Sequence, residues 1–321
     1  MSNQSSGSVS DGTDIRISES GAFERAQSTI REWVSADGST GFEAAPGRYH
    51  LYVSLACPWA HRAVIVRKLK GLEDAIGLTV LDPYRDERGW AFRDVRGAGL
   101  DPVNGFDFLS QAYDATDTAY AGRVSVPVLW DRERGRIVNN ESADVIVMLN
   151  DAWERWATKG LDLYPAQLRP EIDELNARVY ETVNNGVYRA GFATARKSYE
   201  EAVGPLFDTL DVLEERLSSR RYLFDDRITL ADWRLFTTLL RFDPVYHGHF
   251  KCNLRRIVDY PSLWGHLRDL LAIEGVRETV DIDHIKRHYY KTHPAIHPTR
   301  IVPVGPAIDY DEPHGREALD A

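Results

Sequence analysis

The sequence predicts an α/β domain followed by an all-helical domain. Two apolar runs, 49–56 and 78–83, are typical of short buried strands, and between them the apolar residues of 60–70 fall near helical spacing. A strand, a helix and a second strand in this order imply a parallel pair, because parallel strands need such a crossover. Beyond residue 156 the periodic segments are helical, and 321 residues leave room for two domains of ordinary size. We therefore expect an α/β domain over 41–155 and a helical domain over 156–291.

Composition and charge narrow the class of protein. Apolar residues make up 43% and charged residues 27% of the chain, which are ordinary globular proportions and argue against disorder. The formal net charge of −10 argues against a nucleic-acid partner, since phosphate binding needs a basic face. Two cysteines exclude a disulfide framework, and no apolar run approaches the ~18 residues of a membrane helix. We expect a soluble protein of a reducing cytoplasm, with no membrane as a partner.

The two ends of the chain, 1–40 and 292–321, are expected to lie outside these domains. Residues 1–21 are rich in Ser, Gly, Asp and Asn and lack the features of a secretory signal or a transit peptide, which predicts a mobile leader. The apolar residues of 23–34 fall at helical spacing and predict a short helix ahead of the first strand. From 292 to 306 the chain holds four prolines, and we expect an extended tail.

Cys57 stands at the junction between the first strand and the helix that follows it. Pro58 fits the first helical turn, where a missing N–H costs no hydrogen bond, so the thiol is placed at the helix N-terminus. Unpaired N–H groups and the helix dipole favour negative charge there, and the thiolate is the form of cysteine that attacks. A single cysteine is more often a small buried apolar residue. Pro58 favours the reactive interpretation, and His61 and Arg62 add positive charge nearby.

The residues around Cys57 also indicate the kind of thiol chemistry. In a Cys-x-x-Cys pair the second cysteine resolves a mixed disulfide, whereas here the equivalent residue is Ala60. A mixed disulfide on Cys57 would need an outside thiol to release it. Glutathione is the abundant small cytosolic candidate.

Trp90 is the most conspicuous residue of a long polar segment, 84–120. A loop of this length in a compact domain is usually functional. Trp90 either contacts a ligand or, together with Phe92, pins the loop to the core.

The stretch after this loop suits an extended ligand. Residues 123–131 and 137–139 predict a hairpin, in which Pro127 cannot donate a ladder hydrogen bond. The Val126–Pro127 bond is therefore expected on a sheet edge or in a bent connection, with a cis peptide as one form. In either case the backbone of Val126 is left to pair with something extended.

A helix is predicted over 140–150, and its first turn suits an amino-acid head group. Its N–H groups and the Ser142 hydroxyl would hold a carboxylate, while Glu141 would hold an ammonium group. Together with a nucleophilic Cys57, these parts suit a short peptide that carries a sulfur and a free α-amino acid end. Glutathione fits that description.

The second half contains three helical patterns and one start signal. Thr229-Leu230-Ala231-Asp232 has the form of a capping box, with Asp in place of the usual Glu or Gln. The predicted helices span 170–186, 199–216 and 230–240.

Several motifs together resemble one family. They are Cys-Pro-Trp-Ala-His-Arg at 57–62, Gly-Trp-x-Phe at 89–92, Val-Pro-Val-Leu-Trp-Asp at 126–131, Asn-Glu-Ser at 140–142, Asn-Gly-Val-Tyr-Arg-Ala-Gly-Phe-Ala at 185–193 and His-Tyr-Tyr at 288–290. From about Phe23 to Pro306 the chain resembles the glutathionyl-hydroquinone reductases, also called Xi-class or omega-like glutathione transferases. The resemblance implies a thioredoxin-like N-terminal domain, an all-helical C-terminal domain with the tail over it, and a homodimer of an unusual type.

The resemblance also implies roles for individual residues. Cys57 would be the nucleophile and Tyr188 a proton donor or acceptor. Two further tyrosines of the family favour the thiolate and contact the substrate; Tyr246 matches one, and Tyr289 or its neighbour Tyr290 the other. Glutathione would be bound by Trp90, by Arg123, Val124, Ser125 and Val126, and by Glu141 and Ser142.

The leading hypothesis is the reduction of glutathionyl-hydroquinones to free hydroquinones, with glutathione as co-substrate and no metal. An ordinary transferase, or a thiol reductase acting on dehydroascorbate or mixed disulfides, also needs a lone nucleophilic cysteine. A metal site is a second alternative, because His247, His249 and Cys252 offer ligand types at close spacing and His61 lies near Cys57. A third is a binding module without activity, since fold alone does not fix function.

Overall fold

The α/β half is built on a four-stranded mixed sheet. The computed structural model describes residues 15–319, and part of the predicted leader, 1–14, lies outside them, as do the last two residues of the tail. The sheet has the strand order β6-β5-β7-β8. As predicted, β5 (Tyr49–Val53) and β6 (Ile76–Val80) are parallel, and β7 (Val128–Asp131) and β8 (Arg136–Asn139) form an antiparallel hairpin.

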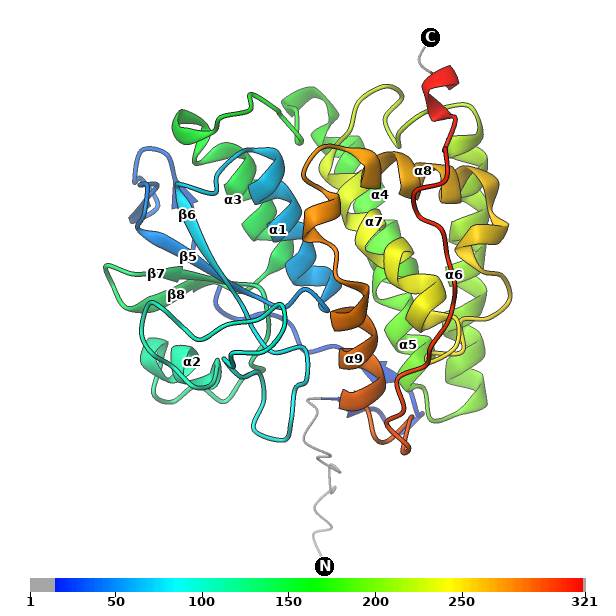
Figure 1. Ribbon diagram of the computed structural model, residues 1–321, viewed down its shortest axis with the longest axis horizontal. Coiled ribbons are helices and arrows are strands. Elements are labelled where there is room, and N and C mark those ends of the chain that lie inside the picture. Colours follow the sequence, from blue (N-terminus) through cyan, green and yellow to red (C-terminus); the bar gives the residue numbers. More distant parts are fainter. Residues whose placement is uncertain (1–14, 320–321) are drawn as a thin grey trace, which may run out of the picture.

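Helices α1 (Pro58–Leu69) and α3 (Ser142–Asp151) lie between the sheet and the helical half, as Figure 1 shows. α1 packs against α3 on one side and against α7 (Leu230–Arg241) of the helical half on the other. Every residue of β5 is buried, which explains its continuous apolar pattern. The sheet and the helical half therefore meet along α1, directly after Cys57.

The helical half confirms the three predicted helices, with interruptions that the sequence did not indicate. The first prediction, 170–186, corresponds to α4 (Arg169–Val179), then a π turn, then the start of a further helix. Thr229 caps α7, and the Thr229 amide donates to Asp232 at 2.8 Å, which completes the predicted capping box. The other helices and π turns are η3 (Tyr180–Asn184), α5 (Gly186–Phe192), α6 (Arg196–Ser218), η4 (Phe242–Tyr246), α8 (Pro261–Ala272) and α9 (Ile282–Thr292).

Arg241, at the end of α7, fixes the turn that precedes Cys57. Its buried guanidinium donates to the carbonyl oxygens of Leu55 at 2.7 Å and Ala56 at 2.8 Å. The same group contacts Nδ1 of His61 at 3.2 Å, and Nε2 of His61 lies 2.8 Å from the Thr279 hydroxyl. These contacts join the two halves through buried polar groups, and they hold the start of α1 in place.

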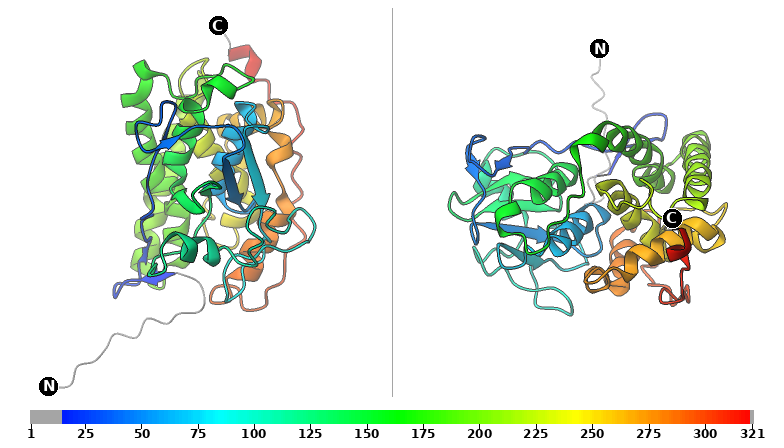
Figure 2. Two further views of the ribbon diagram at one scale, coloured as in Figure 1. Left: turned by 90° about the vertical axis from the view of Figure 1, so that its left-hand side faces the viewer. Right: turned by 90° about the horizontal axis from the view of Figure 1, so that it is seen from above.

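The prediction of a helix over 23–34 is wrong. This segment, called here the N-terminal strap, is extended between β2 (Phe23–Glu24) and β3 (Val34–Ser35). It pairs with the sheet at β8, where the Glu32 amide donates to the Val138 carbonyl at 3.0 Å. The open edge of β8 offers backbone partners that an isolated short helix lacks, so pairing with it overrides the helical spacing. Figure 2 shows the strap in dark blue, running along the molecule.

The long segment 84–120 is not wholly a loop, because it contains α2 (Ser110–Thr116), which packs against β8. The tail lies over the helical half, as the resemblance implied (Figure 1). Arg268 of α8 donates to the carbonyl oxygens of Glu312 and Pro313, both at 2.8 Å. Smaller elements are β1 (Arg16–Ile17), β4 (Phe42–Glu43), η1 (Glu154–Trp156), η2 (Ala166–Leu168), η5 (Ile257–Asp259), η6 (Arg277–Thr279) and η7 (Arg316–Leu319). None of the helices within 15–319 has the length and apolar character needed to cross a bilayer.

Candidate active site

Cys57 is the N-cap residue of α1, and Pro58 follows as the first helical residue, as the sequence predicted. The thiol is partly exposed, and its Sγ lies 3.7 Å from the carbonyl oxygen of Val126. The Val126–Pro127 peptide is cis and lies just before β7, an inner strand, so the bent form of the prediction holds and the edge form does not. The second cysteine, Cys252, is fully buried, and burial raises the pKa of its thiol. Only Cys57 is therefore placed to react.

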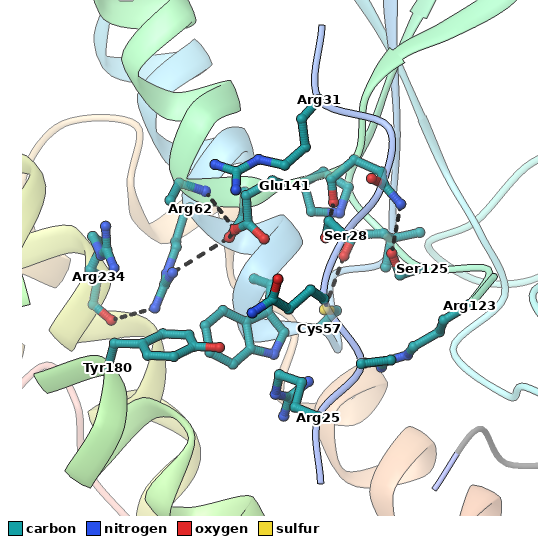
Figure 3. A pocket seen from close by; sticks show the side chains of 18 of the residues that line it. Arg25, Ser28, Arg31, Cys57, Arg62, Arg123, Ser125, Glu141, Tyr180 and Arg234 are labelled. Atoms are coloured by element: carbon teal, nitrogen blue, oxygen red, sulfur yellow. Dashed lines mark hydrogen bonds between the residues drawn. The ribbon is translucent and has the colours of Figure 1, made fainter. Parts of the chain in front are cut away.

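A cleft of about 310 Å³, called here the large cleft, opens beside Cys57 (Figure 3). Seven predicted site residues line it, together with residues from the strap, α1 and the helical half. Val124 does not line it, although its neighbours on both sides do. The predicted residues in its wall are Cys57, Trp90, Arg123, Ser125, Val126, Glu141 and Ser142.

The predicted head-group site lies at the start of α3. Glu141 is the N-cap residue, and its carboxylate accepts a hydrogen bond from the Ala143 amide at 3.1 Å. The buried Arg62 donates to the Ser142 hydroxyl at 3.4 Å and to the Asn184 side-chain oxygen at 2.9 Å. An acidic group and a helix N-terminus thus stand side by side, the pairing that an amino-acid ammonium and carboxylate require.

Arginines dominate the charge of the large cleft, although the chain as a whole is acidic. Burial, and Arg234 nearby, lower the pKa of Arg62 well below its ordinary value. Burial likewise lowers the pKa of Arg234. Arg31 is different, because it forms a two-pronged ion pair with Asp144 at 2.7 and 2.8 Å. Buried cations that outnumber carboxylates favour a ligand with net negative charge.

A smaller pocket of about 70 Å³, called here the ring pocket, adjoins the large cleft and shares Cys57 with it. Its wall is mainly aromatic. It also carries two of the predicted tyrosines, Tyr188 from α5 and Tyr289 from α9. Trp90 lies between the two cavities and lines both, while its indole stacks on the His288 ring at 4.9 Å. Trp90 is thus a buried anchor, as one interpretation expected, and it is also a wall residue, while its contact with a ligand stays a prediction.

Three tyrosine hydroxyls form a chain at the ring pocket. The Tyr289 hydroxyl lies 2.6 Å from that of Tyr188 and 2.9 Å from that of Tyr246. Tyr290 points elsewhere, and its hydroxyl donates to the Pro244 carbonyl at 3.3 Å. Burial raises the pKa of each member of the chain, and Cys57 raises that of Tyr188 further. All three are therefore neutral hydroxyls near pH 7 that can donate a proton.

Both π turns of the described chain serve this region. η3 supplies Tyr180 to the wall of the large cleft and Asn184 to Arg62, and η4 carries Tyr246. A π turn inserts one extra residue in a helix and rotates the side chains that follow, and such turns are frequent at functional sites.

Sequence reasoning missed several residues of the two cavities. It treated the strap as an isolated helix, so it missed the wall residues that the strap supplies. It treated Arg62 only as a source of positive charge near Cys57. A partial signal was available, because arginines beside aromatic residues recur at 23–25, 59–62 and 233–234. The missed wall residues include Arg25, Ser28, Arg31, Trp59, Tyr180, Arg234 and His288.

The residues considered for a metal site are used otherwise. His61 is bound to Thr279 and Arg241, and Cys252 is buried against the Val187 carbonyl. Within the part of the chain that the structure describes, no three His, Cys, Asp or Glu side chains are grouped so that they could hold a metal ion.

Comparisons with known proteins agree with this geometry. The family model for the N-terminal domain of glutathione S-transferase matches 56–152, and that for the C-terminal domain matches 196–269. These ranges fall inside the two predicted domains. The chain is 53% identical to glutathionyl-hydroquinone reductase PcpF of Sphingobium chlorophenolicum, covering 90% of this chain and 91% of that protein. It is 51% identical to glutathionyl-hydroquinone reductase YqjG of Escherichia coli K12, covering 94% of each.

Solved structures give the same result. The glutathione-bound structure of YqjG from Escherichia coli superposes with a TM-score of 0.88 at 52% identity, covering 90% of this chain and 96% of that one. The glutathione S-transferase Xi of Phanerochaete chrysosporium superposes with a TM-score of 0.89 at 48% identity, covering 93% of this chain and 96% of that one.

Proposed function

The chain belongs to the glutathionyl-hydroquinone reductases, the Xi-class branch of the glutathione S-transferase family, and we propose that it reduces glutathionyl-hydroquinones to free hydroquinones at the expense of glutathione. One observation carries the proposal. Cys57 lines both the large cleft, which suits a charged peptide, and the ring pocket, which suits an aromatic ring. A conjugate of the two therefore places its thioether sulfur at Cys57.

The glutathione part would lie in the large cleft. Glu141 would bind the γ-glutamyl ammonium group, and Ser142 with the start of α3 would bind the neighbouring carboxylate. The Val126 amide makes no hydrogen bond within residues 15–319, and Val126 lines this cleft, so the amide would pair with the cysteinyl unit of the ligand. Trp90 would cover the peptide from the side of the ring pocket.

The first chemical step would be attack by the Cys57 thiolate on the sulfur of the conjugate. A disulfide forms between Cys57 and glutathione, and the bond between that sulfur and the ring carbon breaks. The electron pair of the broken bond goes to the ring carbon, which takes a proton from Tyr188. The ring leaves as the free hydroquinone.

The tyrosine chain would supply that proton. Three hydroxyls in a row have three protons, and their two mutual hydrogen bonds use two of them. If Tyr246 donates to Tyr289 and Tyr289 donates to Tyr188, the proton of Tyr188 points into the ring pocket. After transfer, the two donated hydrogen bonds stabilise the Tyr188 phenolate.

A second glutathione would complete the cycle. Its thiolate attacks the glutathione sulfur of the mixed disulfide, oxidised glutathione leaves, and Cys57 is released as a thiolate. The proton of the incoming thiol returns to Tyr188. One conjugate and one glutathione thus give one hydroquinone and one oxidised glutathione, so atoms and electrons balance.

The test follows both products. The purified protein is incubated with a glutathionyl-hydroquinone and glutathione, and free hydroquinone and oxidised glutathione are quantified by chromatography. We expect equal amounts of the two, no turnover by Cys57→Ser, and full turnover by the matched control Cys252→Ser. Near-native turnover by Cys57→Ser would refute the covalent scheme. Turnover of dehydroascorbate or glutathionylated protein, but not of the conjugate, would favour the thiol-reductase alternative.

We also propose a homodimer in the cytoplasm. Both cysteines are free thiols, and a reducing compartment would keep Cys57 reactive. The dimer rests on the family resemblance. Sedimentation equilibrium of the full chain and fractionation of cells that produce it test the two statements, and a monomer or a periplasmic protein would contradict them.

A further inference from the structure

We propose that Arg25 of the strap selects glutathionyl-hydroquinones whose ring carries an anionic group, such as a carboxylate. This inference rests on the proposed function and narrows its substrate class. It comes from four observations on the ring pocket: the place of Arg25, its unused donor, the absence of Asp and Glu from the described wall, and the neighbouring proposed proton donor.

Arg25 reaches the ring pocket from outside both domains. The strap crosses the large cleft, where the Ser28 hydroxyl donates to the Asn140 carbonyl at 3.2 Å. The Arg25 guanidinium then lies over the ring of Tyr188 at 4.5 Å and that of Trp59 at 4.9 Å, measured from Cζ to the ring centres. Its Nε donates to the Asn185 side-chain oxygen at 2.6 Å. Two aromatic faces and one hydrogen bond thus fix its orientation.

One end of Arg25 has no partner. Its Nη2 is buried and makes no hydrogen bond to any described residue, and the same is true of Nε of Arg123. Both residues line the ring pocket and the large cleft. A buried donor without a partner is costly, so these two atoms indicate a ligand acceptor at this place.

The described wall of the ring pocket contains the arginines 25 and 123, which also line the large cleft, and no Asp or Glu is among its described wall residues. Burial lowers the pKa of Arg25, and Arg123 lowers it further, yet a guanidinium keeps its charge in proteins. A neutral hydroquinone would offer the guanidinium groups of Arg25 and Arg123 no counter-charge. A carboxylate on the ring would accept from the Arg25 fork directly.

The position of Arg25 indicates that it recognises the ring of the conjugate and not the glutathione part. Its guanidinium lies against Tyr188, the residue that faces the ring, whereas Glu141 and Arg31 lie toward the opposite end of the large cleft (Figure 3). The alternative is that Arg25 binds the glycyl carboxylate of glutathione. That carboxylate is common to all conjugates, so a comparison between two conjugates separates the alternatives.

The experiment compares the glutathionyl conjugates of hydroquinone and of 2,5-dihydroxybenzoate, which differ by one ring carboxylate. The ratio of their kcat/KM values is measured for the wild type, Arg25→Gln and Arg25→Lys. We expect the wild type to prefer the carboxylate conjugate, and Arg25→Gln to lower that preference by about tenfold to a hundredfold, the range for a hydrogen bond to a charged group. Arg25→Lys should retain part of the preference, because it keeps the charge but not the fork.

Arg31→Gln is the matched control. Arg31 lines the large cleft only and is paired with Asp144, so the ratio should stay at the wild-type value even if both rates fall. An equal loss on both conjugates in Arg25→Gln would overturn the assignment and point to glutathione recognition. No turnover of either conjugate by the wild type would instead refute the proposed function, and the assignment with it.

A measurement on the wild type covers the case in which Arg25→Gln fails to fold. The two free products, 2,5-dihydroxybenzoate and hydroquinone, are compared as inhibitors of the release of hydroquinone. We expect the carboxylate product to inhibit at roughly tenfold lower concentration. Equal inhibition would overturn the proposal.

Discussion

The hydroxyl oxygens of Tyr188 and Tyr289 lie 2.6 Å apart, although 101 positions separate the two residues in the chain. Tyr289 also meets the Tyr246 hydroxyl at 2.9 Å, so it is the middle member of the chain. Removal of the first and of the middle hydroxyl should therefore have different effects.

Tyr188→Phe removes the proposed proton donor and should lower kcat by roughly 10²–10⁴, the range for general acid catalysis. Tyr289→Phe leaves the donor but breaks the chain behind it, and should cost about tenfold, the worth of one strong hydrogen bond. The rate of hydroquinone release measures both. Tyr290→Phe is the control, since its hydroxyl bonds the Pro244 carbonyl outside the chain. A greater loss in Tyr290→Phe than in Tyr289→Phe would contradict this arrangement.

Arg241→Met should loosen the turn before Cys57. The change leaves the carbonyl oxygens of Leu55 and Ala56 buried without their donor, and we expect a loss of about 3 kcal/mol in the free energy of unfolding. Urea unfolding followed by circular dichroism measures it. Arg256→Met is the matched control, because the Arg256 side chain is 54% exposed and its ion pair with Asp259, screened by solvent, should contribute little to stability. Equal losses of stability in the two variants would mean that the buried contacts of Arg241 contribute no more than an exposed ion pair.

Gly191→Ala should disturb the tyrosine chain from behind. A Cβ at Gly191 would lie 2.3 Å from the Phe250 ring, which stacks on Tyr246 at 5.4 Å. We expect a loss of about 1–3 kcal/mol in stability from overpacking, together with a lower kcat. Gly204→Ala, in α6, has open space around its Cβ and should stabilise by about 0.5–1 kcal/mol. Thermal and urea unfolding measure the stability of both variants. An unchanged stability of Gly191→Ala would show that Phe250 can move away.

Stability should fall as the pH drops below about 6.5, the ordinary pKa of histidine. Burial lowers the pKa of His50 to about 4, so below pH ~6.5 the unfolded chain binds a proton that the folded chain does not. The contribution of His50 to the free energy of unfolding is complete above pH ~6.5 and is lost toward pH ~4, at about 1.4 kcal/mol per pH unit. The buried His249, His266 and His288, each with a pKa lowered to about 3, add to this loss.

His50→Gln tests this pH dependence, because an amide can still meet the Thr79 hydroxyl, which lies 2.8 Å from Nε2 of His50. Between pH about 7.5 and 5.5 the variant should lose about 1 kcal/mol less than the wild type. Urea unfolding at the two pH values provides the comparison. Parallel losses in the two proteins would mean that His50 does not titrate as its burial implies.

Local patterns predicted the part of the site that lies close together in sequence. The strand before Cys57, Pro58 at the first helical turn, the Pro127 bend and the start of the helix near Glu141 each depend on neighbouring residues only. Such short-range rules, for proline and for helix ends, hold almost regardless of the rest of the fold.

Sequence reasoning failed where distant partners decide the outcome. Phe23, Ala26, Ile30 and Val34 have helical spacing, yet their segment is extended, because Ile30 and Glu32 exchange hydrogen bonds with Asn140 and Val138. The choice between Tyr289 and Tyr290 depended on which side of α9 faces Tyr188, and local pattern does not contain that information. The same holds for the arginines of the two cavities, which come from the strap, α1, the segment between β6 and β7, and α7.

The strap has one more effect, on encounters between molecules. By hydrogen bonding to β8 it occupies backbone groups at the border of the sheet where a foreign strand would otherwise add. The same twelve residues that shape the cavities thereby shield the protein from sheet-to-sheet aggregation at this border. Deletion of the chain up to residue 34 would therefore remove the proposed substrate contact of Arg25 and would also leave the β8 edge open to aggregation.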